Sequence, residues 1–107
     1  MLTIVALLSC TRTTDQKLVD AAAEGDLERV IMCIDGGANV NARERDDWTP
    51  LTIAAREGHV KIVELLLAKG ADVNKHEGGG HTALFWATKY NREAVVKTLM
   101  NHGAKDE

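Results

Sequence analysis

Short apolar stretches alternate with polar, glycine-containing stretches along the chain, and the apolar positions recur with a step of 33 residues. Three apolar positions and one Gly-Ala pair keep this step through three copies. They are Leu18/Leu51/Leu84, Ala21/Ala54/Ala87, Val30/Val63/Val96 and Gly37-Ala38/Gly70-Ala71/Gly103-Ala104. A repeat of this length predicts a solenoid, in which each unit buries its apolar face by stacking on its neighbours.

Each copy predicts two short helices separated by a glycine, or by an asparagine in the third copy. In the clearest copy, Thr49-Pro50-Leu51 opens the first helix, and Pro50 occupies the first turn, where its missing N–H does no harm. Gly58 ends this helix, the second runs through Val60 to Leu67, and Gly70 closes the unit. Small alanines on the first helix let adjacent units approach closely. The polar stretch 39–47 between two copies is expected to be extended.

The motifs of the second copy carry a resemblance to a known family. They are Thr49-Pro50-Leu51-Thr52-Ile53-Ala54-Ala55, Gly58-His59, Ile62-Val63-Glu64-Leu65-Leu66 and Gly70-Ala71-Asp72-Val73-Asn74. This pattern resembles the ankyrin repeat, and the resemblance extends from about Asp15 to Ala104. It implies an all-α solenoid of stacked helix-turn-helix units with short β-hairpin loops. The domain would cover residues 14–107, with repeats at approximately 14–43, 44–76 and 77–107.

Four positions depart from the family pattern. Thr52 and Phe85 replace the signature histidine, so the usual Thr–His hydrogen bond is expected to be absent. Asp47 stands where the family prefers glycine, and Asn91 replaces the glycine between the two helices of the third unit. Asp and Asn tolerate the left-handed backbone region better than most residues, so both turns are expected to form.

The resemblance also indicates where a partner would bind, because ankyrin repeats use the hairpin tips and the exposed side of the first helix. Carried onto this chain, those positions are Arg43, Arg45, Asp46, Trp48, Arg56, Glu57, His76, His81, Lys89 and Tyr90. Tryptophan, tyrosine and arginine dominate interface energetics. Trp48 could instead pack on its own unit. Trp86 is expected between the layers, since its counterpart is Ile53.

The family resemblance favours a protein–protein interaction module without enzymatic activity, whose protein partner the sequence does not name. The alternative is a small structural spacer, or a fragment of a larger array, with no dedicated partner surface. An exposed aromatic patch around Trp48 and Tyr90 would favour binding, whereas a uniformly charged concave face would favour the spacer.

Composition and charge give no support to other chemistry. The net charge of −3 provides no electrostatic case for nucleic acid or an anionic membrane. His76 and His81 lie near Glu77 but match no zinc spacing, and Gly78-Gly79-Gly80 lacks the Lys-Ser/Thr of a phosphate loop. We therefore expect no metal, no cofactor and no small-molecule substrate. Cys33 occupies a position that is leucine in the other copies, which predicts a buried side chain.

Residues 1–13 lie outside the repeat and have three competing interpretations. Leu7-Leu8-Ser9-Cys10 resembles the lipobox of a bacterial lipoprotein signal, which would make Cys10 the lipidated residue. Against this, no Lys or Arg precedes the apolar run, and the run is short for a signal. A lipidated Cys10 would place the protein at the bacterial cell envelope, attached to the membrane through that lipid; otherwise a cytoplasmic location is expected.

The second interpretation is an irregular cap on the first unit. Leu2–Leu8 looks like the second-helix stretch Val60–Leu66, but it lies too close to Leu18 for a regular repeat. The third interpretation is a disordered start. The lipoprotein-type signal is the favoured one, and mass spectrometry of the protein from its native host would decide among them.

Overall fold

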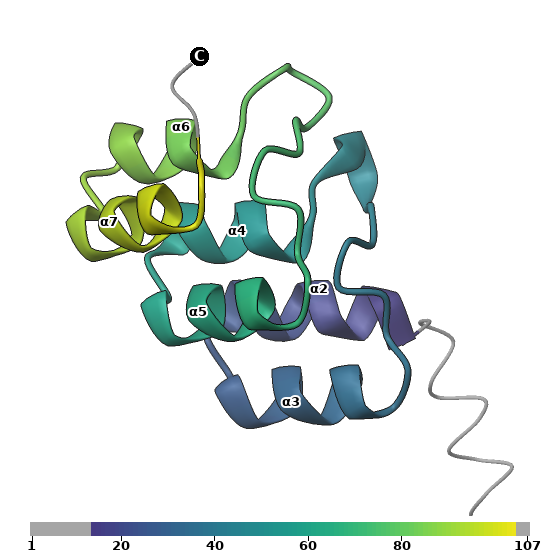
Figure 1. The fold of residues 1–107 in the computed structure, drawn as a ribbon. Coiled ribbons are helices and arrows are strands. Elements are labelled where there is room, and N and C mark those ends of the chain that lie inside the picture. Colours follow the sequence, from purple (N-terminus) through teal and green to yellow (C-terminus); the bar gives the residue numbers. More distant parts are fainter. Residues whose placement is uncertain (1–13, 105–107) are drawn as a thin grey trace, which may run out of the picture.

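The computed structural model describes residues 14–104, which form six α-helices arranged as three stacked pairs (Figure 1). Unit 1 consists of α2 (Thr14–Glu24) and α3 (Leu27–Asp35), unit 2 of α4 (Pro50–Glu57) and α5 (Val60–Ala68), and unit 3 of α6 (Ala83–Lys89) and α7 (Glu93–Asn101). The inner helices α2, α4 and α6 pack on one another in sequence, and the outer helices α3, α5 and α7 form a second layer. The predicted all-α solenoid is thus confirmed.

The core follows the repeated apolar positions. Leu18, Leu51 and Leu84 are buried, and the inner helices contribute fully buried alanines such as Ala21 and Ala54. Small side chains allow the close helix contacts that a stack requires. Cys33 departs from the prediction, because its side chain is only partly buried against the core. Unit 1 has no preceding unit within the described residues, so this part of α3 lies at the edge of the packing.

Hydrogen bonds between neighbouring units repeat with the same step as the sequence. The ring Nε2 of His59 lies 3.2 Å from the carbonyl oxygen of Ala23, and Nε of Arg92 donates to the carbonyl oxygen of Arg56 at 3.0 Å. Each bond joins the start of one outer helix to the end of the inner helix of the preceding unit: α5 to α2, and α7 to α4. The side-chain amides of Asn41 and Asn74 likewise donate to Gly70 and Gly103, both at 3.3 Å. These contacts set the register of the stack.

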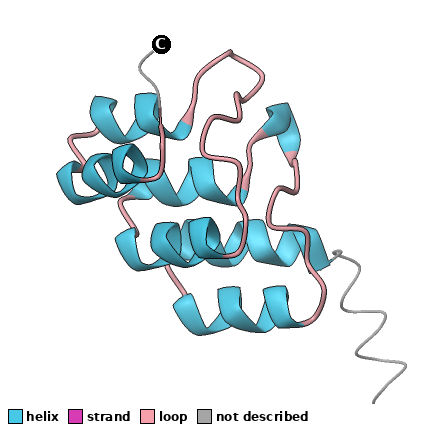
Figure 2. Ribbon diagram, in the orientation of Figure 1, coloured by secondary structure: helices cyan, strands magenta, loops and turns pink. Residues whose placement is uncertain are grey.

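The loops between units differ from the predicted β-hairpins, since no residue from 14 to 104 is in a strand (Figure 2). The first loop is closed by a 2.9 Å bond from the Glu44 amide to the Trp48 carbonyl, and the second by a 2.9 Å bond from Glu77 to His81. Besides the Asn41–Gly70 bond, two bonds join the loops: the Gly78 amide donates to the Asp46 carbonyl at 2.6 Å, and the Asp72 amide donates to Oδ1 of Asn41 at 2.7 Å. One closing bond per loop makes a turn and does not extend into a ladder.

The stretch 39–47 is not extended as expected, because it contains the short 3₁₀ helix η1 (Arg45–Asp47). Asp46 and Asp47 have φ angles of 60° and 63°, in the left-handed region that reverses the chain. Asn91 also has a positive φ, of 57°. The predictions for Asp47 and Asn91 are therefore confirmed, whereas the left-handed geometry of Asp46 was not foreseen.

Threonines cap the inner helices of units 2 and 3. The Thr49 hydroxyl accepts a 3.2 Å bond from the Thr52 amide, and the Thr82 hydroxyl accepts one of 3.4 Å from Phe85. Thr52 also hydrogen-bonds to Thr49 through its own hydroxyl, at 3.0 Å. In unit 2 a Thr–Thr bond therefore takes the place of the Thr–His bond whose absence the sequence predicted.

Candidate functional site

Three aromatic rings line the inner side of units 2 and 3, and we call Trp48, Trp86 and Tyr90 the aromatic strip. The ring centroids of Trp48 and Trp86 are 5.0 Å apart, and those of Trp86 and Tyr90 are 6.1 Å apart with nearly parallel planes. Trp86 and Tyr90 are adjacent because they lie four residues apart, on α6 and at its C-terminal cap. Trp48 comes from the loop before α4, so the strip bridges two units.

Trp86 is the centre of this cluster. The sequence predicted this residue between the layers, because its counterpart is Ile53, but its side chain is only partly buried and contacts Trp48 at the candidate surface. His81 stacks on Phe85 with centroids 3.8 Å apart, and both rings meet the Trp86 ring edge-on. The buried Nε1 of Trp86 has no hydrogen-bond acceptor among the described residues. Sequence reasoning missed Trp86 and Phe85 as site residues, although the spacing of Trp86 and Tyr90 places them together.

Two cations lie over the strip. The guanidinium carbon of Arg56 is 4.9 Å from the Trp48 ring centroid, and Nζ of Lys89 is 5.1 Å from Trp86 and 5.9 Å from Tyr90. These are cation–π distances. Arg56 also forms an ion pair with Glu57, at 2.8 Å between Nε and Oε2. The strip is therefore partly exposed aromatic surface with positive charge on top of it.

Two hollows flank Arg56. One, of about 320 Å³, is lined by Glu44, Arg45, Asp46, Trp48, Ile53 and Arg56. The other, of about 280 Å³, is lined by Arg56, Glu57, Tyr90 and Arg92. Arg56 forms a wall of both, so the hollows lie on either side of one side chain along the inner face. Arg92 is a further residue that the sequence analysis did not assign to this surface.

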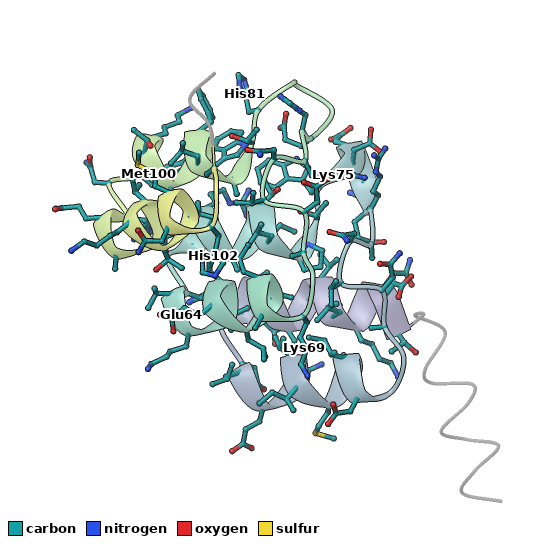
Figure 3. All side chains as sticks on the ribbon, viewed as in Figure 1. Glu64, Lys69, Lys75, His81, Met100 and His102 are labelled. Atoms are coloured by element: carbon teal, nitrogen blue, oxygen red, sulfur yellow. The ribbon has the colours of Figure 1, made fainter. Side chains whose placement is uncertain are left out.

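The remaining predicted site residues lie on the loops. Arg43, Arg45 and Asp46 are exposed around the first loop, and Arg43 pairs with Asp47 at 3.9 Å. His76 is exposed on the second loop, whereas His81 is partly buried at the point where that loop enters α6 (Figure 3). The structure thus brings Trp48, Arg56, Glu57, His81, Lys89 and Tyr90 together around Trp86.

The Glu77 carboxylate stabilises the second loop through a hydrogen bond within that loop. Its side chain is buried, and Oε1 accepts a 3.0 Å bond from the His81 amide. Within residues 14–104, no group of three or more His, Cys, Asp or Glu side chains is placed to hold a metal ion. None of the helices in this part of the chain has the length and apolar character needed to cross a membrane. The predicted lipidation residue, Cys10, lies outside the described residues.

Stacked two-helix units that pack on one another in sequence define a helical-repeat protein. The chain belongs to the ankyrin-repeat family, because the family described as ankyrin repeats (3 copies) matches residues 18–106. No curated protein sequence matches the chain significantly. Ankyrin repeats are generally protein–protein interaction modules and are typically non-catalytic, and no catalytic family matches this chain.

Proposed function

We propose that this protein binds a protein partner through the aromatic strip and the loop tips beside it, on the concave inner face of units 2 and 3. The observation that carries the proposal is the exposure of large aromatic rings at this place. Tyr90 is 46% exposed, and Trp48 and Trp86 are partly exposed. Aromatic and arginine side chains account for most of the binding energy at protein interfaces.

The alternative of a spacer without a partner surface is less well supported. A spacer needs an inner face that water solvates, whereas on this face Trp48 lines a hollow of about 320 Å³ and Tyr90 lines one of about 280 Å³. Small hollows beside exposed rings are suited to receive side chains of a partner. The domain limits at 14–107, and the repeat limits within it, are part of this proposal.

The experiment is a triple substitution at Trp48, Arg56 and Tyr90 to alanine. A partner captured by affinity purification from the source organism and identified by mass spectrometry would be titrated against both proteins. The triple variant should bind at least about tenfold more weakly, since one such side chain contributes about 1 kcal/mol or more. Circular dichroism would establish that the variant keeps its helices.

A matched control replaces three exposed outer-helix residues, Met32, Lys61 and Met100, with alanine. This control should leave the affinity within about twofold, because surface side chains outside an interface contribute little. Equal affinity of the wild-type and the Trp48/Arg56/Tyr90 variant would refute the assignment of the surface.

For residues 1–13 we propose a lipoprotein-type signal ending at Cys10, with an irregular cap and a disordered start as the competing possibilities. The proposal rests on the apolar run followed by Leu7-Leu8-Ser9-Cys10. Mass spectrometry of the protein from its native host tests it. A chain that retains Met1 and carries an unmodified Cys10 would exclude the lipidation.

A further inference from the structure

Charge changes along the inner face from unit to unit. Equivalent positions can be compared across the three units in the order 1, 2, 3: Asp15/Trp48/His81, Asp20/Ile53/Trp86, Ala23/Arg56/Lys89 and Glu24/Glu57/Tyr90. Unit 1 has three carboxylates at these positions, unit 2 has one carboxylate and one cation, and unit 3 has a lysine and no carboxylate. These positions therefore become more positive from unit 1 to unit 3, and the aromatic strip lies over units 2 and 3.

The cations that lie over or beside the aromatic strip near Tyr90 outnumber the carboxylates there. Arg56, Lys89 and Arg92 lie around Tyr90 or over the strip, and Glu57 is the carboxylate among them. In the part of the chain that the structure describes, neither Lys89 nor Arg92 forms an ion pair. Around Tyr90, three cations against one carboxylate make a local positive excess in a chain whose net charge is −3, whereas the hollow beside Trp48 adds Arg45 but also Glu44 and Asp46. Such an excess beside exposed rings is complementary to a ligand that is both acidic and apolar.

Unit 1 limits how far such a ligand extends. Asp15 accepts a 2.8 Å bond from the Asn39 amide, and Glu24 is exposed and pairs with Arg29 at 3.0 Å. Lys17 is the one cation of α2, since Arg29 lies on α3. Exposed ion pairs are weak, so the carboxylates of unit 1 still disfavour further negative charge. Acidic groups of a ligand are therefore favoured over units 2 and 3 and not over unit 1.

We propose that the partner contributes an acidic peptide segment, which seats an apolar side chain on the aromatic strip and places carboxylates beside Lys89, Arg56 and Arg92. This inference rests on the proposed function, because it assigns a chemistry to the partner of that same surface. The hollow that Trp48 and Ile53 line receives the apolar group, and Arg56, Arg92 and Lys89 fix the position of the carboxylates.

The test is selection of binders from a displayed library of random peptides of about 12 residues, a length that spans about 40 Å when extended. The full-length chain is the target. Enriched peptides should carry two or more Asp or Glu residues close to an aromatic or large aliphatic residue. Fluorescence anisotropy with a labelled peptide from the enriched set then gives affinities for variants of the protein.

Lys89→Glu should weaken peptide binding at least about tenfold, because it replaces the attraction between Lys89 and a peptide carboxylate with a repulsion. Lys97→Glu makes the same charge change at an exposed position of α7 and should change the affinity by less than about twofold. Glu57→Gln should tighten binding about two- to fivefold, since it releases Arg56 from its ion pair. A gain of this kind does not arise from misfolding.

Enrichment of neutral or basic peptides, or equal effects of Lys89→Glu and Lys97→Glu, would overturn the inference, and so would a library that yields no binder. A single-stranded oligonucleotide of equal net charge that binds as tightly as the peptide would also overturn it. If Trp48→Ala and Tyr90→Ala weaken peptide binding while Lys89→Glu does not, the proposed function is supported and the acidic character of the partner is refuted. If neither Trp48→Ala nor Tyr90→Ala changes the affinity for the peptides, the proposed binding surface itself is refuted.

Discussion

The close contact between units 2 and 3 at Gly58 leads to a quantitative prediction. Gly58 caps α4 with a φ of 82°, and a Cβ built on it would lie 2.8 Å from Cδ of Arg92. Gly70 has a similar φ of 96°, but a Cβ there would meet nothing within 4 Å. The substitutions Gly58→Ala and Gly70→Ala therefore share the backbone strain and differ in the contact with the next unit.

The expected losses can be worked out separately. A left-handed backbone costs an alanine about 1–2 kcal/mol, which both variants incur. At Gly58 the arginine must also move away, which breaks its 3.0 Å bond to the Arg56 carbonyl. A hydrogen bond from a charged donor contributes about 1.5–3 kcal/mol. Arg92 has a flexible side chain that can relax, so we expect Gly58→Ala to lose about 1.5 kcal/mol more than Gly70→Ala.

Urea denaturation followed by circular dichroism measures both free energies of unfolding. A difference of about 1.5 kcal/mol corresponds to roughly 6–12 °C in Tm for a domain of this size. The control is Gly58→Ala made in an Arg92→Ala background, where the additional loss should disappear. Equal losses for the Gly58 and Gly70 variants, or an additional loss that persists without Arg92, would refute the reasoning.

Four further variants, one of them a control, test the packing, a cap and the aromatic strip. Leu66→Ala should reduce the free energy of unfolding by about 2–5 kcal/mol, because Leu66 is fully buried. The control Met100→Ala, at a 54% exposed position, should change that free energy by less than about 0.5 kcal/mol. Urea titration measures both. Thr49→Ala should cost about 1–2 kcal/mol through loss of the cap of α4, measured as a lower Tm, and an unchanged Tm would contradict the cap. Trp48→Phe should remove the exciton coupling between two indoles 5.0 Å apart and alter the aromatic circular dichroism, while an identical spectrum would argue against the Trp48–Trp86 contact.

The repeated positions predicted the fold because each of them has one physical role in every copy. Leucine at 18, 51 and 84 is buried in all three units, since each faces the same interface in the stack. Cys33 shows the limit of this argument. It shares the register of the buried Leu66 and Leu99, yet it is partly exposed, because units 2 and 3 each have a preceding unit to pack against and unit 1 has none within the described residues.

The loops were less predictable than the helices. Periodicity of apolar residues carries no information on a turn, and the first loop depends on two consecutive aspartates with positive φ. Asp47 could be predicted from a position where the family prefers glycine. Asp46 was not predicted, although its counterpart in the third copy is Gly79, and the resulting 3₁₀ turn replaced the expected extended stretch.

The candidate site was predicted in its members but not in its centre. Trp48, Arg56, Lys89 and Tyr90 were chosen one by one from their positions in the repeat. Trp86 was assigned to packing because its counterpart is Ile53, which the structure shows to be buried. A tryptophan is too large for that position, so its ring extends to the surface and contacts Trp48 of the preceding unit. Side-chain size at a packing position is thus what joins the separate residues into one strip.

Asn91 illustrates how much of one residue's role the sequence reveals. From the sequence, its replacement of glycine is a matter of backbone angle, and the φ of 57° agrees with that. At the equivalent Gly25 and Gly58, however, the missing Cβ also leaves room for His59 and Arg92 of the following unit. Asn91 has a Cβ at this place. Arg92 reaches the Arg56 carbonyl through the space beside Gly58. The Cβ of Asn91 would block the equivalent approach to the Lys89 carbonyl. The face that unit 3 presents beyond α6 and α7 therefore offers different contacts from the face that unit 2 presents to unit 3.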